Sequence, residues 1–409
     1  MLVIIVIVLV VANLKGANAP PAMTISVWGT DPEETIKPFI SAYSKVRPNV
    51  TVNYVQVDPT KYAQTVLNAQ AAAQGPDVFM ISDRSLATTW NRIVPVPAAQ
   101  FNIGQLKQNF PQVVEQDLTD ANGNIYGLPL YIDTLALLYN RDMFDQAAIV
   151  GPPKSWDELE RYVPYFKNQD HTGQLVKMAA ALGGSQKSVT HATDLLSLFM
   201  MQNGATMLEG DQKTFATGQA GLTGLTTYLK FSDQSDAAYT WNDSMPNSLD
   251  SFAQGNAAMV FGYHSDLEYI KNKSPFINMG VASMPQVAGA EAVNYAAYQA
   301  LVVSSQSKYP AWAWDLVIQL TTNPNNAKMY MDVTKRPPAL RTLIGANVND
   351  PDLGVFARQA LTARSWRMPD EARTNAILDE SIRAVLSGQL SASMAIRGAA
   401  EKIQALLKQ

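Results

Sequence analysis

The sequence predicts an α/β protein built as two lobes, and two observations support that prediction. The chain has 409 residues, more than a single hydrophobic core usually organises. From Met23 onward, apolar runs of strand length alternate with stretches whose apolar residues recur at helical spacing. This alternation is typical of a mostly parallel sheet flanked by helices.

The first eighty residues show the alternation element by element. Residues 23–28 and 50–54 have the pattern of strands. Between them a helix is expected to begin with the Asp31 carboxylate as its N-cap and Pro32 at the first helical position. A second helix follows the second strand, and residues 78–81 then have the length of a fully buried strand.

The rest of the chain is less regular, but five elements are clear. Residues 155–158 form a capping-box pattern that begins a helix. Residues 248–253 predict a short helix, residues 257–261 a buried strand and residues 295–304 one long strand. Apolar residues at helical spacing over 396–407 predict an amphipathic C-terminal helix.

The composition excludes several classes of function. A net charge of −4 and a pI near 5.5 leave no basic surface on the scale that nucleic-acid binding needs. The absence of cysteine excludes disulfides, thiolate metal sites and a lipidated cysteine anchor. The three histidines, His171, His191 and His264, lie far apart in the sequence, so we expect no metal site. We expect no cofactor, because no P-loop or dinucleotide fingerprint occurs.

The N-terminus indicates export, and residues 1–22 are expected to be a signal peptide or an N-terminal membrane anchor. The apolar run Met1 to Ala12 suits a signal peptide better than a membrane span, and Ala17-Asn18-Ala19 resembles a cleavage site. No basic residue precedes the run, however, and Pro20 hinders cleavage. These departures favour an anchor, which would be the only membrane contact of a protein whose body lies in the periplasm or at the outer face of the membrane.

The strongest candidate for a ligand site follows the strand at 78–81. Asp83 and Arg84 stand side by side beyond its carboxyl end, where open α/β sheets bind ligands. A carboxylate and a guanidinium together offer acceptors and donors that suit a polyhydroxylated ligand. The alternative is a salt bridge in a surface loop, and these residues alone do not decide between the two.

Sugar sites also need flat rings, against which the C–H faces of the sugar pack. Aromatic side chains in or beside predicted loops and strand ends are candidates, each with core packing as the alternative. They are Trp28, Tyr131, Trp241, Tyr263, Tyr298 and Trp366, and Asn242 beside Trp241 is a candidate polar contact.

Six short motifs occur in a specific order and spacing, although each alone is only a turn or a cap. They are Val27-Trp28, Gly75-Pro76-Asp77, Gly127-Leu128-Pro129, Leu138 to Asp142, Ser155 to Leu159 and Phe252 to Met259. From Met23 to the C-terminus, the chain thereby resembles the large extracytoplasmic solute-binding proteins of ABC importers, in the branch that includes maltose-binding protein.

The resemblance implies a two-lobe periplasmic-binding-protein fold. It also implies a monomer that captures a sugar or oligosaccharide by hinge closure and delivers it to an ABC transporter permease. Asp83 and Arg84 fall on an Asp-Arg pair that binds sugar hydroxyls, and Asp133 falls on a ligand-binding glutamate. His264 falls on a tryptophan that stacks on sugar, a ring that Tyr263 would supply instead.

The same resemblance suggests where the chain divides. We expect one lobe to comprise residues 23–131 and 297–345, and the other residues 135–294 and 346–409. The chain would then cross between the lobes near Asp133, Tyr295 and Gly345.

Two alternatives remain open. The cargo could instead be a polyamine, a peptide or an anion, and Arg84, Arg336 and Arg341 could serve an anion site. A secreted glycosidase or lyase would need Asp83 and Asp133 to face each other across a scissile bond. Against the enzyme, we expect Arg84 to lower the pKa of Asp83 and hold it ionised, the wrong state for a general acid.

Overall fold

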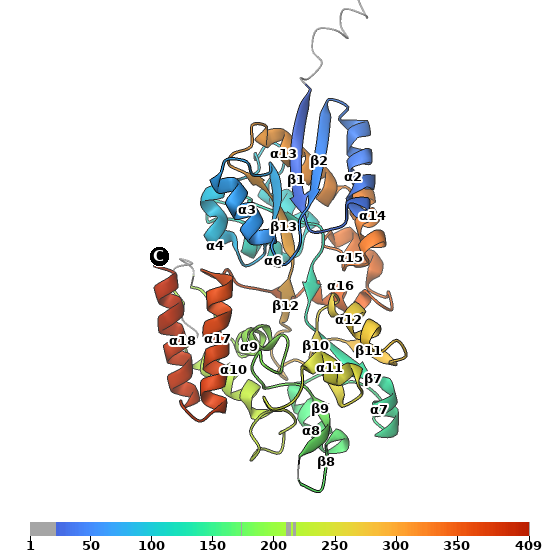
Figure 1. Cartoon of the computed structure of the whole chain (residues 1–409), viewed down its shortest axis with the longest axis vertical. Helices are drawn as coiled ribbons and strands as arrows, with labels where there is room; N and C mark the ends of the chain where they lie inside the picture. Colours follow the sequence, from blue (N-terminus) through green and yellow to red (C-terminus); the bar gives the residue numbers. More distant parts are fainter. Residues whose placement is uncertain (1–21, 173, 210–213, 216–217, 409) are drawn as a thin grey trace, which may run out of the picture.

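The computed structural model describes residues 22–172, 174–209, 214–215 and 218–408. The predicted signal peptide or anchor at residues 1–22 lies, except for its last residue, outside these ranges. Within them, no helix is both long and apolar enough to cross a membrane. The described elements enclose two hydrophobic cores along the long axis, which we call the upper and lower cores after their places in Figure 1.

The upper core surrounds a mixed sheet in which the strand order is β2-β1-β3-β13-β4. Strand β1 runs parallel to β2 and β3, whereas β13 runs antiparallel to β3, β4 and β5. The strands are β1 (Met23–Gly29), β2 (Val50–Gln56), β3 (Val78–Ser82), β4 (Ile93–Val94), β5 (Leu128–Pro129) and β13 (Gln299–Ser304).

The lower core contains a second mixed sheet, of order β11-β7-β10-β9-β8. Only the β9–β10 pair is parallel. The expectation of mostly parallel sheets is therefore wrong in both halves, because hydrophobic periodicity carries no information on strand direction. The strands are β7 (Ala136–Asn140), β8 (Asn168–Gln169), β9 (Leu175–Ala180), β10 (Ala257–Gly262) and β11 (Met279–Ala282).

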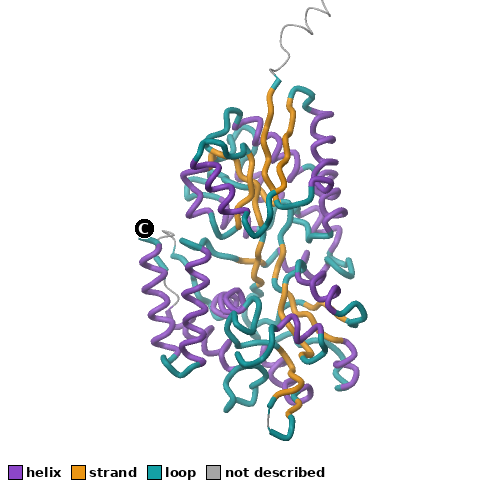
Figure 2. The backbone as a smooth tube through the Cα atoms, in the orientation of Figure 1, coloured by secondary structure: helices purple, strands orange, loops and turns teal. Residues whose placement is uncertain are grey.

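Helices surround both sheets, as Figure 2 shows. The predicted short helix is present as α11, and the predicted C-terminal helix as α18. Around the upper sheet lie α2 (Glu33–Val46), α3 (Tyr62–Ala71), α4 (Leu86–Thr89), the 3₁₀ helix η1 (Trp90–Arg92), α5 (Ile103–Asn109), α6 (Gln112–Leu118), α13 (Pro310–Thr322), α14 (Pro324–Thr334) and α15 (Arg341–Asn347). The others are α7 (Arg141–Gln146), α8 (Trp156–Phe166), α9 (Ala192–Gln202), α10 (Gly218–Lys230), α11 (Ser248–Ala253), α12 (Asp266–Lys273), α16 (Gly354–Ala360), α17 (Glu371–Leu386) and α18 (Ala392–Leu406).

Three short strands join the two halves, in the order β14-β12-β6. They are β6 (Asp133–Thr134), β12 (Asn294–Ala297) and β14 (Ala363–Arg364). Strand β12 lies at the middle of Figure 1, between the two sheets. The third connecting strand, β14, comes later in the chain than Gly345, which lies within α15.

The long strand predicted over residues 295–304 is two strands, β12 and β13, with Tyr298 between them. The backbone of Tyr298 is held by Asp83, whose own N–H donates to the Tyr298 carbonyl at 3.1 Å. The Tyr298 N–H in turn donates to Asp83 Oδ1 at 3.3 Å. These contacts let the chain leave one sheet for the other, which an unbroken apolar pattern could not indicate.

Helices α9 and α10 pack closely in the lower core at Gly224. A Cβ atom at this position would lie 2.6 Å from the backbone N and Cα of Met200. Gly224→Ala should therefore destabilise the protein by about 1–3 kcal/mol, since neither backbone can give way easily. Urea unfolding followed by circular dichroism measures this.

Gly398 in α18 is the matched control, because a Cβ atom there would meet no heavy atom within 4 Å. Gly398→Ala should stabilise the protein by about 0.5–1 kcal/mol, the usual gain of alanine over glycine in a helix. Stabilisation by both substitutions would contradict the close packing of α9 on α10.

Candidate ligand-binding site

A cavity of about 1690 Å³ is lined by elements of both halves. Its volume exceeds the ~300–1,000 Å³ of most small-molecule pockets, which leaves room for an oligomeric ligand. Among the described residues, no group of three or more His, Cys, Asp or Glu side chains could hold a metal ion. Seven of the predicted site residues line the cavity: Asp83, Arg84, Tyr131, Asp133, Tyr263, His264 and Tyr298.

Arg84 connects the two halves through its guanidinium. The residue follows β3 of the upper sheet, and its Nη1 and Nη2 donate to the two carboxylate oxygens of Asp194 at 2.8 and 3.3 Å. Asp194 lies in the first turn of α9 and lines the cavity. Nη2 also donates to the carbonyl of Ala296 at 3.2 Å, and the guanidinium lies 4.8 Å from the ring centre of Tyr295. Protein groups thus bond to both terminal nitrogens, whereas Nε has no hydrogen-bond partner among the described residues.

Asp83 keeps one carboxylate oxygen free of hydrogen bonds. Within the described residues, neither its Oδ2 nor the Nε of Arg84 has a hydrogen-bond partner, and the two atoms lie 3.8 Å apart. Burial raises the pKa of Asp83 to about 8, although Arg84 opposes the shift. The expectation that Arg84 holds Asp83 ionised is therefore wrong, because desolvation costs the carboxylate more than the adjacent guanidinium returns.

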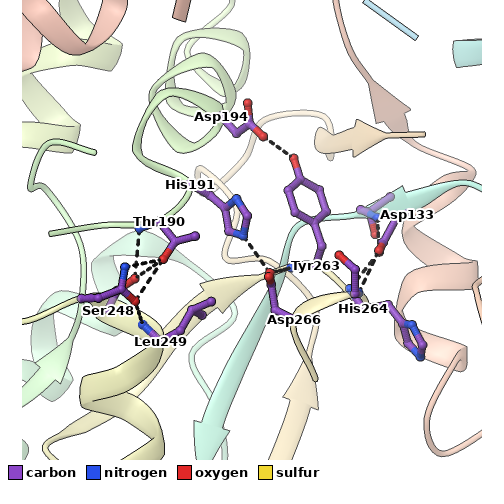
Figure 3. A network of polar contacts seen from close by, with 12 residues as sticks. Asp133, Thr190, His191, Asp194, Ser248, Leu249, Tyr263, His264 and Asp266 are labelled. Carbon is purple, nitrogen blue, oxygen red and sulfur yellow. Dashed lines mark hydrogen bonds and ion pairs between the residues drawn. The ribbon is translucent and has the colours of Figure 1, made fainter. Parts of the chain in front are cut away.

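A chain of hydrogen bonds supports the lower wall of the cavity (Figure 3). Asp266 Oδ2 lies 2.7 Å from Nε2 of His191 and accepts the backbone N–H of Tyr263 at 2.7 Å. The Tyr263 hydroxyl donates to Asp194 at 2.6 Å. Burial disfavours a charged His191, but the Asp266 carboxylate outweighs this and raises the pKa of the ring. The chain fixes Asp194 in position as the partner of Arg84.

Most of the sequence matches one known family. Residues 36–351 fit the sequence profile of the bacterial extracellular solute-binding proteins. The chain belongs to this family. Its extracytoplasmic location, expected from the N-terminus, is thereby confirmed.

Relatives of this solute-binding protein match it over nearly the whole chain. The galactooligosaccharide-binding protein of Bacillus subtilis is 24% identical, covering 93% of this chain and 89% of its own. The sn-glycerol-3-phosphate-binding periplasmic protein of Pectobacterium atrosepticum is 22% identical, with 97% and 94% covered. Among solved structures, the sugar-binding protein MalE from Xanthomonas citri is similar with a TM-score of 0.78 at 19% identity, over 94% of this chain and 98% of that one. The likeness confirms the predicted two-lobe fold.

Asp133 holds the loop that follows β10. Its carboxylate accepts three backbone N–H groups, those of Thr134 (2.8 Å), His264 (2.9 Å) and Ser265 (3.1 Å). Figure 3 shows the carboxylate facing this loop. Burial raises the pKa of Asp133 to about 7, while the three backbone donors lower it. In this solute-binding protein Asp133 therefore organises the loop that carries Tyr263 and His264.

The aromatic and imidazole rings in the cavity have partners of their own. The His264 ring meets Phe356 edge to face at 5.3 Å, and burial lowers the His264 pKa to about 4, so the ring is neutral at pH 7. The Tyr298 hydroxyl donates to Asp117 at 2.7 Å. Tyr131 carries the guanidinium of Arg336 over its ring at 4.7 Å. A ligand can use only the ring surfaces that these contacts leave open.

Two of the predicted residues belong to the lower half, away from the cavity lining. Trp241 is fully buried in the lower core and donates from its indole nitrogen to Ser188 at 3.1 Å. The Asn242 side chain accepts the backbone N–H of Ser244 at 2.8 Å and donates to the Tyr239 hydroxyl at 2.6 Å. Trp241 is thus packed in the core, the alternative given for its ring, and Asn242 caps a turn, so we leave both residues out of the proposed site.

Trp28 and Trp366 also lie outside the cavity lining. Trp28 is half-buried against the upper core, and its carbonyl accepts the Tyr62 hydroxyl at 2.9 Å. Trp366 is buried in the lower core with its ring 5.4 Å from that of Phe215. Loop position alone could not separate these rings from those that face the cavity.

Sequence reasoning missed a cluster around Asp31 in the cavity lining. The Asp31 carboxylate pairs with Arg336 at 2.9 Å and accepts the Tyr330 hydroxyl at 2.8 Å. The prediction that Asp31 caps α2 is wrong, since Pro32 holds the N-cap position and no side chain caps the helix. The position of Asp31 in the sequence could have revealed this cluster. Asp31 follows the carboxyl end of β1 as Asp83 follows that of β3, and ligands bind beyond these strand ends in open α/β sheets.

The buried carboxyl of Asp133 should make stability depend on pH. Its folded pKa lies above the usual value, so between about pH 4 and pH 7 the folded state holds the extra proton. The stability that this group contributes is complete at low pH and is lost as the pH rises through about 7. Each pKa unit corresponds to about 1.4 kcal/mol, which makes the loss on the order of a few kcal/mol.

Asp133→Asn, which cannot titrate, provides the comparison. Between pH 4.5 and pH 8, wild type should lose stability relative to this variant in urea unfolding experiments. A wild type that instead gains stability over the variant as pH rises would show that the carboxylate is stabilised in its charged form.

Proposed function

We propose that this solute-binding protein captures a carbohydrate in the cavity and delivers it to an ABC-type permease. One observation carries the proposal: the free Asp83 Oδ2 and the free Arg84 Nε lie 3.8 Å apart in residues that line the cavity. A hydroxyl group can donate to the first atom and accept from the second, so it satisfies both. Tyr131 and Tyr263 supply rings nearby for the apolar face of a sugar.

The names of relatives favour the same class of ligand. A galactooligosaccharide-binding protein and the sugar-binding MalE support a saccharide. A relative that binds sn-glycerol-3-phosphate points instead to a phosphate ester. The two arginines that line this cavity argue against an anion, because Arg84 is paired with Asp194 and Arg336 with Asp31.

The rival function is a secreted glycosidase or lyase. Because the pKa of Asp83 is raised, Arg84 does not hold this acid ionised, and Asp83 could act as a proton donor. Two other observations argue for binding without catalysis. Asp133, the second acid of such a pair, is engaged by three backbone N–H groups, and the relatives named above are binding proteins.

Function then depends on movement of two lobes about the three connecting strands. One proposed lobe comprises residues 23–131 and 297–345, and the other comprises residues 135–294 and 346–409. Ala357, Ala360 and Ala363 pack in the upper core, however. Their packing favours moving the boundary at residue 345 to about residue 364. Because few segments cross, rotation about β6, β12 and β14 would disturb little packing. A monomer with this hinge suits recognition by a permease.

Purified protein should bind a saccharide reversibly and leave it unchanged. A thermal-shift screen of mono- and oligosaccharides tests binding, since a ligand at 100 times its Kd adds ~2.7 kcal/mol of stability. Chromatography of the recovered ligand tests the second point. Product that accumulates in proportion to protein would contradict a binding role.

Asp83→Ala should weaken binding of the saccharide found in that screen by ~2–4 kcal/mol, because a ligand hydroxyl would be left buried and unpaired. Titration calorimetry measures the change. Trp28→Phe is the control, because Trp28 lies outside the cavity lining, and it should leave the affinity unchanged. A lower melting temperature for Asp83→Ala at unchanged affinity would identify Asp83 as structural.

Ligand should draw the lobes together. Small-angle scattering at saturating saccharide should therefore give a smaller radius of gyration than the protein alone, since closure buries ligand between the two halves. Identical profiles with and without ligand would contradict hinge closure.

A further inference from the structure

The guanidinium of Arg84 faces three carboxylates. Asp194 lies at 2.8 Å, Glu371 at 3.6 Å and Asp83 at 3.8 Å. Asp194 and Glu371 stand in the first turns of α9 and α17, where a helix stabilises negative charge. One fixed positive charge thus meets three acidic groups from both halves of the molecule.

Within the described residues, none of the other lysines and arginines that line the cavity forms an ion pair with these acids; they are Lys271, Lys328, Lys335 and Arg336. Along the same cavity, Arg336 is paired with Asp31 and Lys328 with Asp332. Arg367, whose charge acts on Asp117, donates to the backbone carbonyls of Gln116 and Thr119. Carboxylates outnumber lysine and arginine in the cavity lining as a whole.

Of the three acids that face Arg84, Asp83 lies farthest from the guanidinium. Its side chain is only 2% exposed, and its Oδ2 accepts no hydrogen bond from the described residues. Burial, Asp117 and Glu371 all raise its pKa, and Arg84 alone among charged side chains lowers it. A buried carboxyl oxygen that accepts no hydrogen bond is best satisfied by a charged donor.

We propose that the saccharide carries a protonated amine, which binds against Asp83 and Glu371. This inference rests on the proposed function and adds the chemical class of the sugar. An ammonium group brings the missing positive charge and three donors. It can bond to Asp83 Oδ2 and to Glu371, while hydroxyls of the same sugar reach Arg84 Nε and the tyrosines. Phosphorylated and acidic sugars would add negative charge to a cavity that already holds an excess.

Binding of such a ligand should release a proton. At pH 7 Asp83 holds its proton because water is excluded, and the charged groups facing it are Arg84, Asp117 and Glu371. An ammonium beside Asp83 favours the ionised carboxylate, so the proton leaves as the ligand enters. A neutral sugar gives no such release.

Titration calorimetry with matched ligands tests the proposal on the whole purified protein. Glucosamine, galactosamine and β-1,4-linked glucosamine oligomers are each compared with their N-acetylated forms, which keep the ring and lose the charge. Glucose, galactose and maltotetraose extend the neutral set. At pH 7 we expect at least one amine to bind about tenfold or more tightly than its acetylated partner, a difference of one charge-assisted contact. Its binding enthalpy should vary with the ionisation enthalpy of the buffer.

Asp83→Asn should abolish both the preference for the amine and the buffer dependence, so that each amine binds no more tightly than its N-acetylated partner. Asp332→Asn is the control, since this acid lines the same cavity but is paired with Lys328 at 2.7 Å; it should change neither. Equal or tighter binding of neutral sugars would overturn the amine while leaving the carbohydrate function intact. Failure of every sugar in both sets to bind would overturn both.

Discussion

The buried guanidinium of Arg84 connects the upper and lower halves of this protein. It extends from the end of β3 to the first turn of α9, so the upper sheet and a lower helix share one ion pair. A buried charge is tolerated only when it is paired, and Asp194 supplies the pair for Arg84. The remainder of the site follows from that requirement: Tyr263 fixes Asp194, Asp266 fixes the Tyr263 backbone, and His191 balances the charge of Asp266.

The same exclusion of water gives the cavity its chemical character. Burial raises the pKa of three carboxyl groups, those of Asp83, Asp117 and Asp133. The Oδ2 of Asp117 accepts two hydroxyls and the carboxylate of Asp133 accepts three backbone N–H groups, so both are satisfied by the protein. Asp83 is different, because one of its oxygens and the neighbouring Arg84 Nε are left without hydrogen bonds. In the proposed function, the incomplete pair therefore binds the ligand groups, and the complete ones hold the walls.

Fold and site are linked through the connecting strands. Strand β12 passes from the lower sheet toward β13. At the break, the Tyr298 carbonyl accepts the backbone N–H of Asp83, and the Tyr298 N–H donates to the Asp83 carboxylate. Asp133 is the first residue of β6, which pairs with β12, and its carboxylate holds the loop that carries Tyr263 and His264. A movement of the two halves would therefore directly shift the residues that face the cavity.

Local features were determined by the sequence alone. The short helix at Ser248–Ala253, the strand that begins at Ala257 and the site address of Asp83 and Arg84 all follow from turns and periodicity within a few residues. Strand direction, the break at Tyr298 and the role of Asp31 did not follow. Nor did the partner of Arg84, which lies 110 residues away in the chain. Only the tertiary structure decided these points and separated Trp241 in the core from Tyr131 in the cavity, because burial and charge pairing are set by contacts between distant segments that local sequence does not record.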